Sequence, residues 1–187
     1  MSIHALLVLP GIVIHELGHY LLCRLVGAPV KEVVFFDQAG PSGYVVHTIP
    51  RRLRHHLVIV AGPLLLNSAL SFLLFRAAAS SLGLPGGILL DRSVGFIPRI
   101  VQIFLAVLLG TSIALQAIPS LTDASSLWTV ALERLERGNL LALGVLPFAG
   151  GLILVNYLRR FWIDWLYLAL LAALAVWFPG GQPGHAG

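Results

Sequence analysis

The residues whose types and spacing best suit chemistry are His15, Glu16 and His19, which together form a His-Glu-x-x-His motif. In an α-helix, residues four positions apart lie on one face, about one turn from each other. This spacing lets two imidazole nitrogens reach a single zinc ion, while Glu16 stands where it can activate a water molecule. The motif therefore predicts one catalytic zinc, with His15 and His19 as ligands and Glu16 as general base.

The surroundings of this motif are unusually apolar. Residues 3–14 are almost entirely hydrophobic, and Tyr20-Leu21-Leu22 continues the run beyond the histidines. A charged residue at the centre of a membrane helix costs roughly 2.5–3.5 kcal/mol on insertion scales, so ionisable groups there are candidates for function. The alternative is a buried structural hydrogen bond between Glu16 and one histidine, which leaves the second histidine unexplained.

The overall composition is that of a membrane protein. Of 187 residues, 58% are hydrophobic and 11% are charged, and the mean hydropathy is +0.91. So few charges cannot cover the surface of a soluble domain of this length. The net charge of +4 comes mainly from arginines at the ends of apolar runs, which favours contact with a lipid bilayer over nucleic acid. Cys23 is the only cysteine, which excludes an internal disulfide and a multi-cysteine zinc site.

Apolar runs predict an all-α membrane protein of about five transmembrane helices, because each run is long enough to cross a core of ~30 Å. A small β-hairpin is expected after the first helix, from β-type runs at 33–36 and 44–46 that flank a turn-rich segment. The expected spans are 3–26, 57–75, 100–122, 138–158 and 161–178.

The C-terminal third is expected to close the bundle. Residues 125–137 have an amphipathic pattern that predicts a short helix on the membrane surface. The last two spans would form a helical hairpin with an interfacial belt of Phe161, Trp162, Trp165 and Tyr167. This suggests a membrane core over 1–128, and a second part over 129–187 with the end of the surface helix, the hairpin and a flexible tail.

The distribution of positive residues gives a small preference for one orientation of the chain across the membrane. The loops after the first and third spans, with Arg24, hold seven lysines and arginines, against five on the other side. This favours an external N-terminus and cytoplasmic placement of these loops, in the cell (inner) membrane. Arg159, Arg160 and Asp164 then fall on the opposite side. The N-terminus lacks a basic segment and is expected to be retained.

Two segments carry a resemblance to a known family. HELGHYLLCRLVGAPVKEVVFF resembles the zinc-binding helix and following β-hairpin of the site-2 protease family of intramembrane zinc metalloproteases, and AGPLLLNSAL is similar to its second core helix. The third span ends in QAIPSLTDA, where the family usually has Asn-x-x-Pro followed by Leu-Asp-Gly; here Gln116 replaces the asparagine and Ala124 the glycine. The resemblance covers roughly residues 3–128.

A catalytic zinc needs a third protein ligand, and we expect Asp123 to supply it. Asp123 ends an uncharged run just past Pro119, where a helix break could turn a carboxylate inward. Glu32 is expected to form a surface ion pair with Lys31, and Asp37 to be solvated in the hairpin turn. Asp91 and Asp164 belong to the opposite side of the predicted topology. Asp123 could instead be the N-cap of the following helix.

The resemblance and the motif together predict an intramembrane zinc metalloendopeptidase that cleaves transmembrane protein substrates. One alternative is a catalytically silent membrane scaffold that binds transmembrane helices, for which Glu16 would be unnecessary. Another is a membrane zinc hydrolase with a non-peptide substrate. Asn67 could hydrogen-bond a neighbouring helix or position a substrate.

Overall fold

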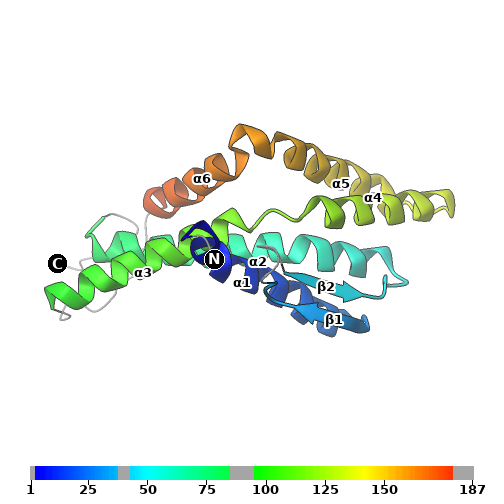
Figure 1. Cartoon of the computed structure of the whole chain (residues 1–187). Helices are drawn as coiled ribbons and strands as arrows, with labels where there is room; N and C mark the ends of the chain where they lie inside the picture. Colours follow the sequence, from blue (N-terminus) through cyan, green and yellow to red (C-terminus); the bar gives the residue numbers. More distant parts are fainter. Residues whose placement is uncertain (1–2, 38–42, 85–94, 179–187) are drawn as a thin grey trace, which may run out of the picture.

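The computed structural model describes residues 3–37, 43–84 and 95–178, and these form a mostly helical molecule with one β-hairpin (Figure 1). Asp91 and the expected flexible tail lie outside the described residues. The elements are α1 (Ile3–Val26), β1 (Val30–Val34), β2 (Tyr44–His47), α2 (Leu53–Ser81), α3 (Phe96–Leu115), α4 (Leu121–Glu136), α5 (Leu141–Leu158), the short 3-10 helix η1 (Arg159–Phe161) and α6 (Ile163–Trp177).

Helix α2 is the common support of the fold, since each of the other α-helices packs against it. Its 29 residues contribute to three buried clusters. Ile59 packs with Cys23 of α1, Val60 packs with residues of α4 and α5, and Phe75 packs with residues of α3 and α6. A single long apolar helix therefore holds the N-terminal motif helix and the C-terminal half in one body.

Small residues allow the first three helices to approach closely. The backbone N–H of Gly11 in α1 donates to Ser112 Oγ in α3 over 2.9 Å. A Cβ at Gly11 would lie 2.0 Å from the Ser112 carbonyl oxygen, and a Cβ at Gly62 in α2 would lie 2.0 Å from Leu22 Cδ1. Gly62 and Pro63 lie inside α2, where they allow close helix packing near the motif.

The predicted hairpin is confirmed. Strands β1 and β2 pair antiparallel, with Val34 opposite Tyr44 and an irregularity between Val30 and Glu32. Tyr44 donates from its hydroxyl to Glu32 over 2.8 Å, so the partner of Glu32 is this tyrosine and not the expected Lys31. Hydrogen bonding to Glu32 raises the pKa of the Tyr44 phenol.

The amphipathic segment forms α4, but its apolar face is covered by protein. Leu127 and Val130 are buried in a cluster with Ala142 and Val145 of α5 and residues of α2. The prediction of a helix with this apolar face is confirmed, and the face is covered by protein because α5 folds back and packs along it (Figure 1). Its expected position on the membrane surface stays a prediction.

Helices α5 and α6 do not form the expected closing hairpin. They meet at an open angle at Arg159–Phe161, and each packs on different neighbours: α5 on α4, and α6 on α2 and α3 (Figure 1). Trp162 in the left-handed conformation (φ 66°) turns the chain between them. Phe161, Trp162 and Trp165 are exposed as a belt would require, but the Tyr167 hydroxyl turns inward and hydrogen-bonds Ser68 of α2.

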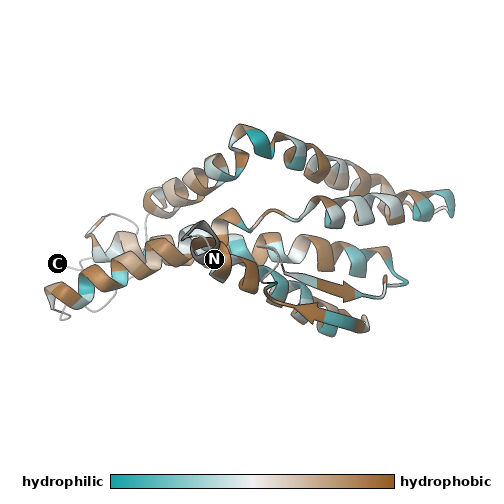
Figure 2. Cartoon of the chain, in the orientation of Figure 1, coloured by the Kyte–Doolittle hydropathy of each residue, from teal (hydrophilic) through white to brown (hydrophobic). Residues whose placement is uncertain are grey.

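Three of the described helices are long and apolar enough to cross a membrane: α2, α3 and the continuous segment of α5 with η1. These three helices suggest a multi-pass membrane protein. Helix α6 is apolar but has only 15 residues, and α1 carries the polar motif and Arg24 within its 24 residues. Figure 2 shows hydrophilic residues gathered at the end of the molecule that holds the hairpin and the α4–α5 turn, and again at the α5–α6 bend.

Candidate metal centre

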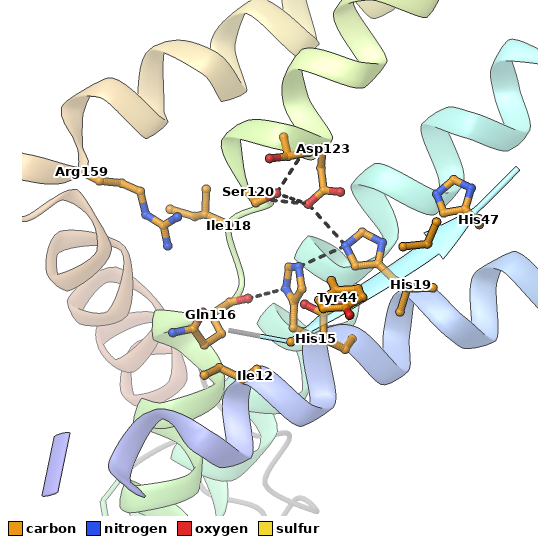
Figure 3. A pocket seen from close by; sticks show the side chains of 15 residues that line it. Ile12, His15, His19, Tyr44, His47, Gln116, Ile118, Ser120, Asp123 and Arg159 are labelled. Atoms are coloured by element: carbon orange, nitrogen blue, oxygen red, sulfur yellow. Dashed lines mark hydrogen bonds and ion pairs between the residues drawn. The ribbon is translucent and has the colours of Figure 1, made fainter. Parts of the chain in front are cut away.

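His15, His19 and Asp123 converge on one point, as the sequence predicts. His15 Nε2 and His19 Nε2 are 3.2 Å apart, and His19 Nε2 lies 3.6 Å from Asp123 Oδ2. The two histidines come from successive turns of α1, whereas the aspartate comes from the first turn of α4 (Figure 3). Both histidine side chains are buried and the Asp123 side chain is 28% exposed, so the three potential ligand atoms share a partly open space.

The histidines are oriented by backbone groups on the far side of their rings. His15 donates from Nδ1 to the carbonyl oxygen of Gln116 over 2.6 Å. Because a carbonyl only accepts, the proton of His15 resides on Nδ1 and its Nε2 presents a lone pair to the centre. The backbone of Ile59 in α2 lies beside the His19 ring. Such partners fix the tautomer and ring orientation of metal-binding histidines.

The donor set fits a zinc ion. Ligand atoms at about 2.0–2.2 Å from a tetrahedral zinc lie about 3.4 Å from one another, and the two observed separations, 3.2 and 3.6 Å, bracket that value. All three ligand atoms lie within 4.8 Å of one another. Two imidazoles and one carboxylate leave a fourth position for water or substrate, as catalytic zinc sites do.

Asp123 makes two sets of contacts in the structure, one with His19 and one with Ser120. Ser120 is the N-cap of α4, and Asp123, the third residue of the helix, completes a capping box with it. Asp123 Oδ2 accepts from Ser120 N over 3.1 Å and from Ser120 Oγ over 2.6 Å. The alternative that Asp123 is itself the N-cap is therefore wrong, because Ser120 holds that position. Burial would raise the pKa of this carboxyl, but His19 and the Ser120 hydrogen bond outweigh burial and lower the pKa to about 2. The carboxylate is thus ionised, as a metal ligand must be.

Among the described residues, the other carboxylates considered as ligands do not line the cavity around the histidines. Glu32 is engaged by Tyr44, and Asp164 forms an ion pair with Arg159 over 2.9 Å. Neither Asp37 nor Glu32 belongs to the set of residues that line the cavity around the histidines.

A cavity of about 580 Å³ opens in front of the three ligands. Glu16 lines it from α1, beside both histidines, and residues 43–47 of the hairpin line it from the other side. Gly43 lies against the glutamate, since a Cβ there would be 2.7 Å from Glu16 Cγ and 2.6 Å from the Val34 carbonyl oxygen. The general base predicted from the motif therefore faces the same space as the ligands, with strand β2 along its border.

Asn67 of α2 hydrogen-bonds the end of a neighbouring helix, which is the first of its two expected roles. Its amide donates to the Gln116 carbonyl oxygen over 3.1 Å, so one carbonyl accepts from both Asn67 and His15. Asn67 is fully buried, and its Oδ1 has no hydrogen-bond partner among the described residues. The sequence signal for this role was an uncompensated amide inside an apolar helix, but the partner is a backbone atom that no side-chain pattern reveals.

Arg159 was assigned to the wrong side. It lines the same cavity as Asp123, although the charge distribution had placed it, Arg160 and Asp164 across the membrane. The error follows from the α5–α6 bend, because a polar turn between two apolar runs was interpreted as a loop at the far surface. His56 is also buried, and it hydrogen-bonds Ser126 of α4 over 3.1 Å.

Comparison of the chain with protein-family models, with curated proteins and with solved structures found no match.

Proposed function

We propose that this protein is an intramembrane zinc metalloprotease that hydrolyses peptide bonds in or near transmembrane segments of other proteins. The observation that carries the proposal is the convergence of His15, His19 and Asp123, from helices far apart in the sequence, beside Glu16 in a cavity. A structural zinc site would need neither an open position nor an adjacent unliganded carboxylate.

Each residue has a distinct part in the proposed reaction. His15, His19 and Asp123 would hold one zinc ion, which when bound supplies Lewis acidity that polarises the scissile carbonyl and eases deprotonation of water. Glu16 takes the proton from the attacking water and later delivers it to the leaving amine. Gln116 and Asn67 keep the His15 ring in the orientation that presents Nε2.

The hairpin offers a way to hold an extended substrate. Strand β2 pairs with β1 along one edge, and its residues line the cavity. A transmembrane helix must unwind before a peptide carbonyl can be attacked, because its backbone groups are otherwise paired internally. The unwound segment would add to β2 as a further strand, which satisfies part of its backbone.

The membrane setting is part of the proposal. The three long apolar helices support a multi-pass protein, and we propose that α1 and the segment from α5 through α6 complete the membrane-embedded body. The histidines lie in the central part of α1, which would put hydrolysis within the bilayer. The excess of positive residues around the hairpin favours a cell-membrane protein whose centre opens toward the cytoplasm.

The direct test is hydrolysis of single-span reporter proteins by the purified chain in liposomes. We expect cleavage within or beside the span, loss of cleavage with a zinc chelator and recovery on zinc addition. Glu16→Gln serves as the inactive control with its zinc retained. Peptide cleavage that persists both with the zinc chelator present and in Glu16→Gln would refute the proposal.

Two outcomes would identify the alternatives. Reporter binding without any cleavage by the zinc-loaded chain would indicate a helix-binding scaffold. Hydrolysis of esters that depends on zinc and on Glu16, while the peptide reporters remain uncut, would indicate a hydrolase acting on a non-peptide substrate.

A further inference from the structure

Arg159 is the one lysine or arginine among the described residues that line the cavity. It lies at the bend between α5 and α6, and Figure 3 shows its side chain extending toward Ile118, on the other side of the metal ligands from strand β2. Its side chain is 28% exposed, so the guanidinium is neither fully buried nor free in solvent.

The position of this guanidinium is fixed by neighbours from both sides of the bend. Its Nε donates to both carboxylate oxygens of Asp164 over 3.0 and 2.9 Å, and its Nη1 donates to Asn156 Oδ1 over 3.3 Å. Asn156 donates in turn to the carbonyl of Pro119, in the segment that leads to Asp123. The arginine is thereby tied to the same connection that positions the third ligand.

These contacts leave part of the guanidinium for another partner. A guanidinium has five N–H donors, and the contacts with Asp164 and Asn156 employ Nε and Nη1. An ion pair that served only to stabilise the bend would not need to border a cavity of about 580 Å³. Arg160 provides the contrast, because it lies next in sequence, is absent from the cavity lining and stacks over the Phe161 ring at 5.0 Å.

An extended substrate would need donors on the side opposite β2. A strand has hydrogen-bonding groups along both edges, and pairing with β2 satisfies only one of them. Carbonyls on the outer edge would remain without a protein partner, at a cost that grows as the bound segment is removed from water. We propose that Arg159 is a substrate-binding residue, whose guanidinium donates to backbone carbonyls on the outer edge of a peptide strand laid along β2. This assignment rests on the proposed function and defines the substrate as an unwound, extended segment.

The test measures binding separately from hydrolysis. The parent protein for the test is Glu16→Gln, and the probe is a fluorescent single-span polyleucine peptide with a central Gly-Pro pair. The affinity of the protein for this peptide is measured in detergent by fluorescence anisotropy. Zinc content is measured on the same samples. The main variant is the double change Arg159→Gln with Asp164→Asn, which removes both charges together and leaves neither charge without its partner. Arg160→Gln is the matched control.

We expect the double variant to bind the peptide about tenfold more weakly or worse, because charged hydrogen bonds to a poorly solvated carbonyl are lost. Its zinc content should equal that of the parent, Arg160→Gln should bind as the parent does, and Asp164→Asn alone should lose less than the double variant. With Glu16 restored, the double variant should raise KM more than it lowers kcat.

Equal peptide affinity of the parent and the double variant, with zinc retained, would overturn the assignment and make the pair a structural feature of the bend. A lower kcat with unchanged peptide affinity would overturn it as well. A parent that binds no transmembrane peptide would refute the proposed function together with this assignment, so the two failures are distinguishable.

Discussion

His15 and Asn67 donate to the same acceptor, the carbonyl oxygen of Gln116, over 2.6 and 3.1 Å. The motif helix, α2 and the end of α3 therefore meet at a single backbone atom. This junction orients His15, and under the proposed function it would link zinc binding to the packing of three helices.

Asn67→Ala should weaken zinc binding about tenfold or more, as the loss of groups that orient a metal-binding histidine commonly does. Competition with a chromogenic chelator measures the affinity. Ser71→Ala is the matched control, since Ser71 lies one turn further along α2 and is buried with no hydrogen-bond partner for its Oγ among the described residues. Equal effects of the two changes would indicate a general packing loss.

Glu16→Gln should lower hydrolysis by about a hundredfold or more, in line with the contribution of a general base. Zinc content and the circular-dichroism spectrum should stay close to those of the unchanged protein, because Glu16 is not one of the three converging groups. Turnover that survives this substitution would remove the proposed mechanism.

Asp123→Asn should separate the two roles of this carboxylate. The amide oxygen can still accept from Ser120 and cap α4, but it is a much poorer zinc ligand than a carboxylate. We expect a sharp fall in bound zinc, with the helical content kept. Asp37→Ala should change neither quantity. Full zinc occupancy in Asp123→Asn and Asp123→Ala would mean that another residue completes the site.

Gly11→Ala should destabilise the contact between α1 and α3, because its new methyl group would lie 2.0 Å from the Ser112 carbonyl oxygen. Overpacking of this kind costs about 1–3 kcal/mol, which should lower the Tm in detergent. Gly18→Ala in the same helix is the control: its Cβ would meet no atom closer than 3.6 Å. A Tm fall of equal size in both variants would contradict the proposed close approach.

Topology mapping should label residues at positions 51 and 137 from the same side of the membrane, and a residue at position 84 from the other. The hairpin and the α4–α5 turn lie at one end of the molecule, and the C-terminal end of α2 lies at the other (Figure 1). Single cysteines at these positions, in a chain with Cys23 replaced by serine, would be tested with an impermeant thiol reagent. Labelling of positions 51 and 137 from opposite sides would exclude this arrangement.

Much of the candidate site could be predicted because its determinants are side-chain types at helical spacing. His15 and His19 lie on one helix face whatever the tertiary fold, and Asp123 was singled out by the scarcity of carboxylates near an apolar run. The backbone acceptors, the Gln116 carbonyl above all, could not be predicted, because every residue has a carbonyl and only tertiary packing selects one.

The arrangement of the C-terminal third was harder to predict for a related reason. The apolar face of Leu127 and Val130 correctly indicated a helix, but periodicity does not say whether lipid or protein covers that face. The pair Arg159 and Asp164 marked a break between two apolar runs. A polar break looks the same in sequence at a membrane surface and beside a polar cavity, and only the contacts of α6 with α2 and α3 distinguish them.

Because Asp123 Oδ2 contacts both α4 and α1, zinc binding at the proposed centre would be thermodynamically linked to the folding of both halves of the chain. The same oxygen closes the first turn of α4 and faces His19 of α1. An ion that binds only the folded chain stabilises it in proportion to its affinity and concentration. Bound zinc would thus connect the start of α4 to the motif helix α1. Hydrogen exchange in the first turn of α4 would then report whether zinc is bound, even in a variant that has no catalytic activity.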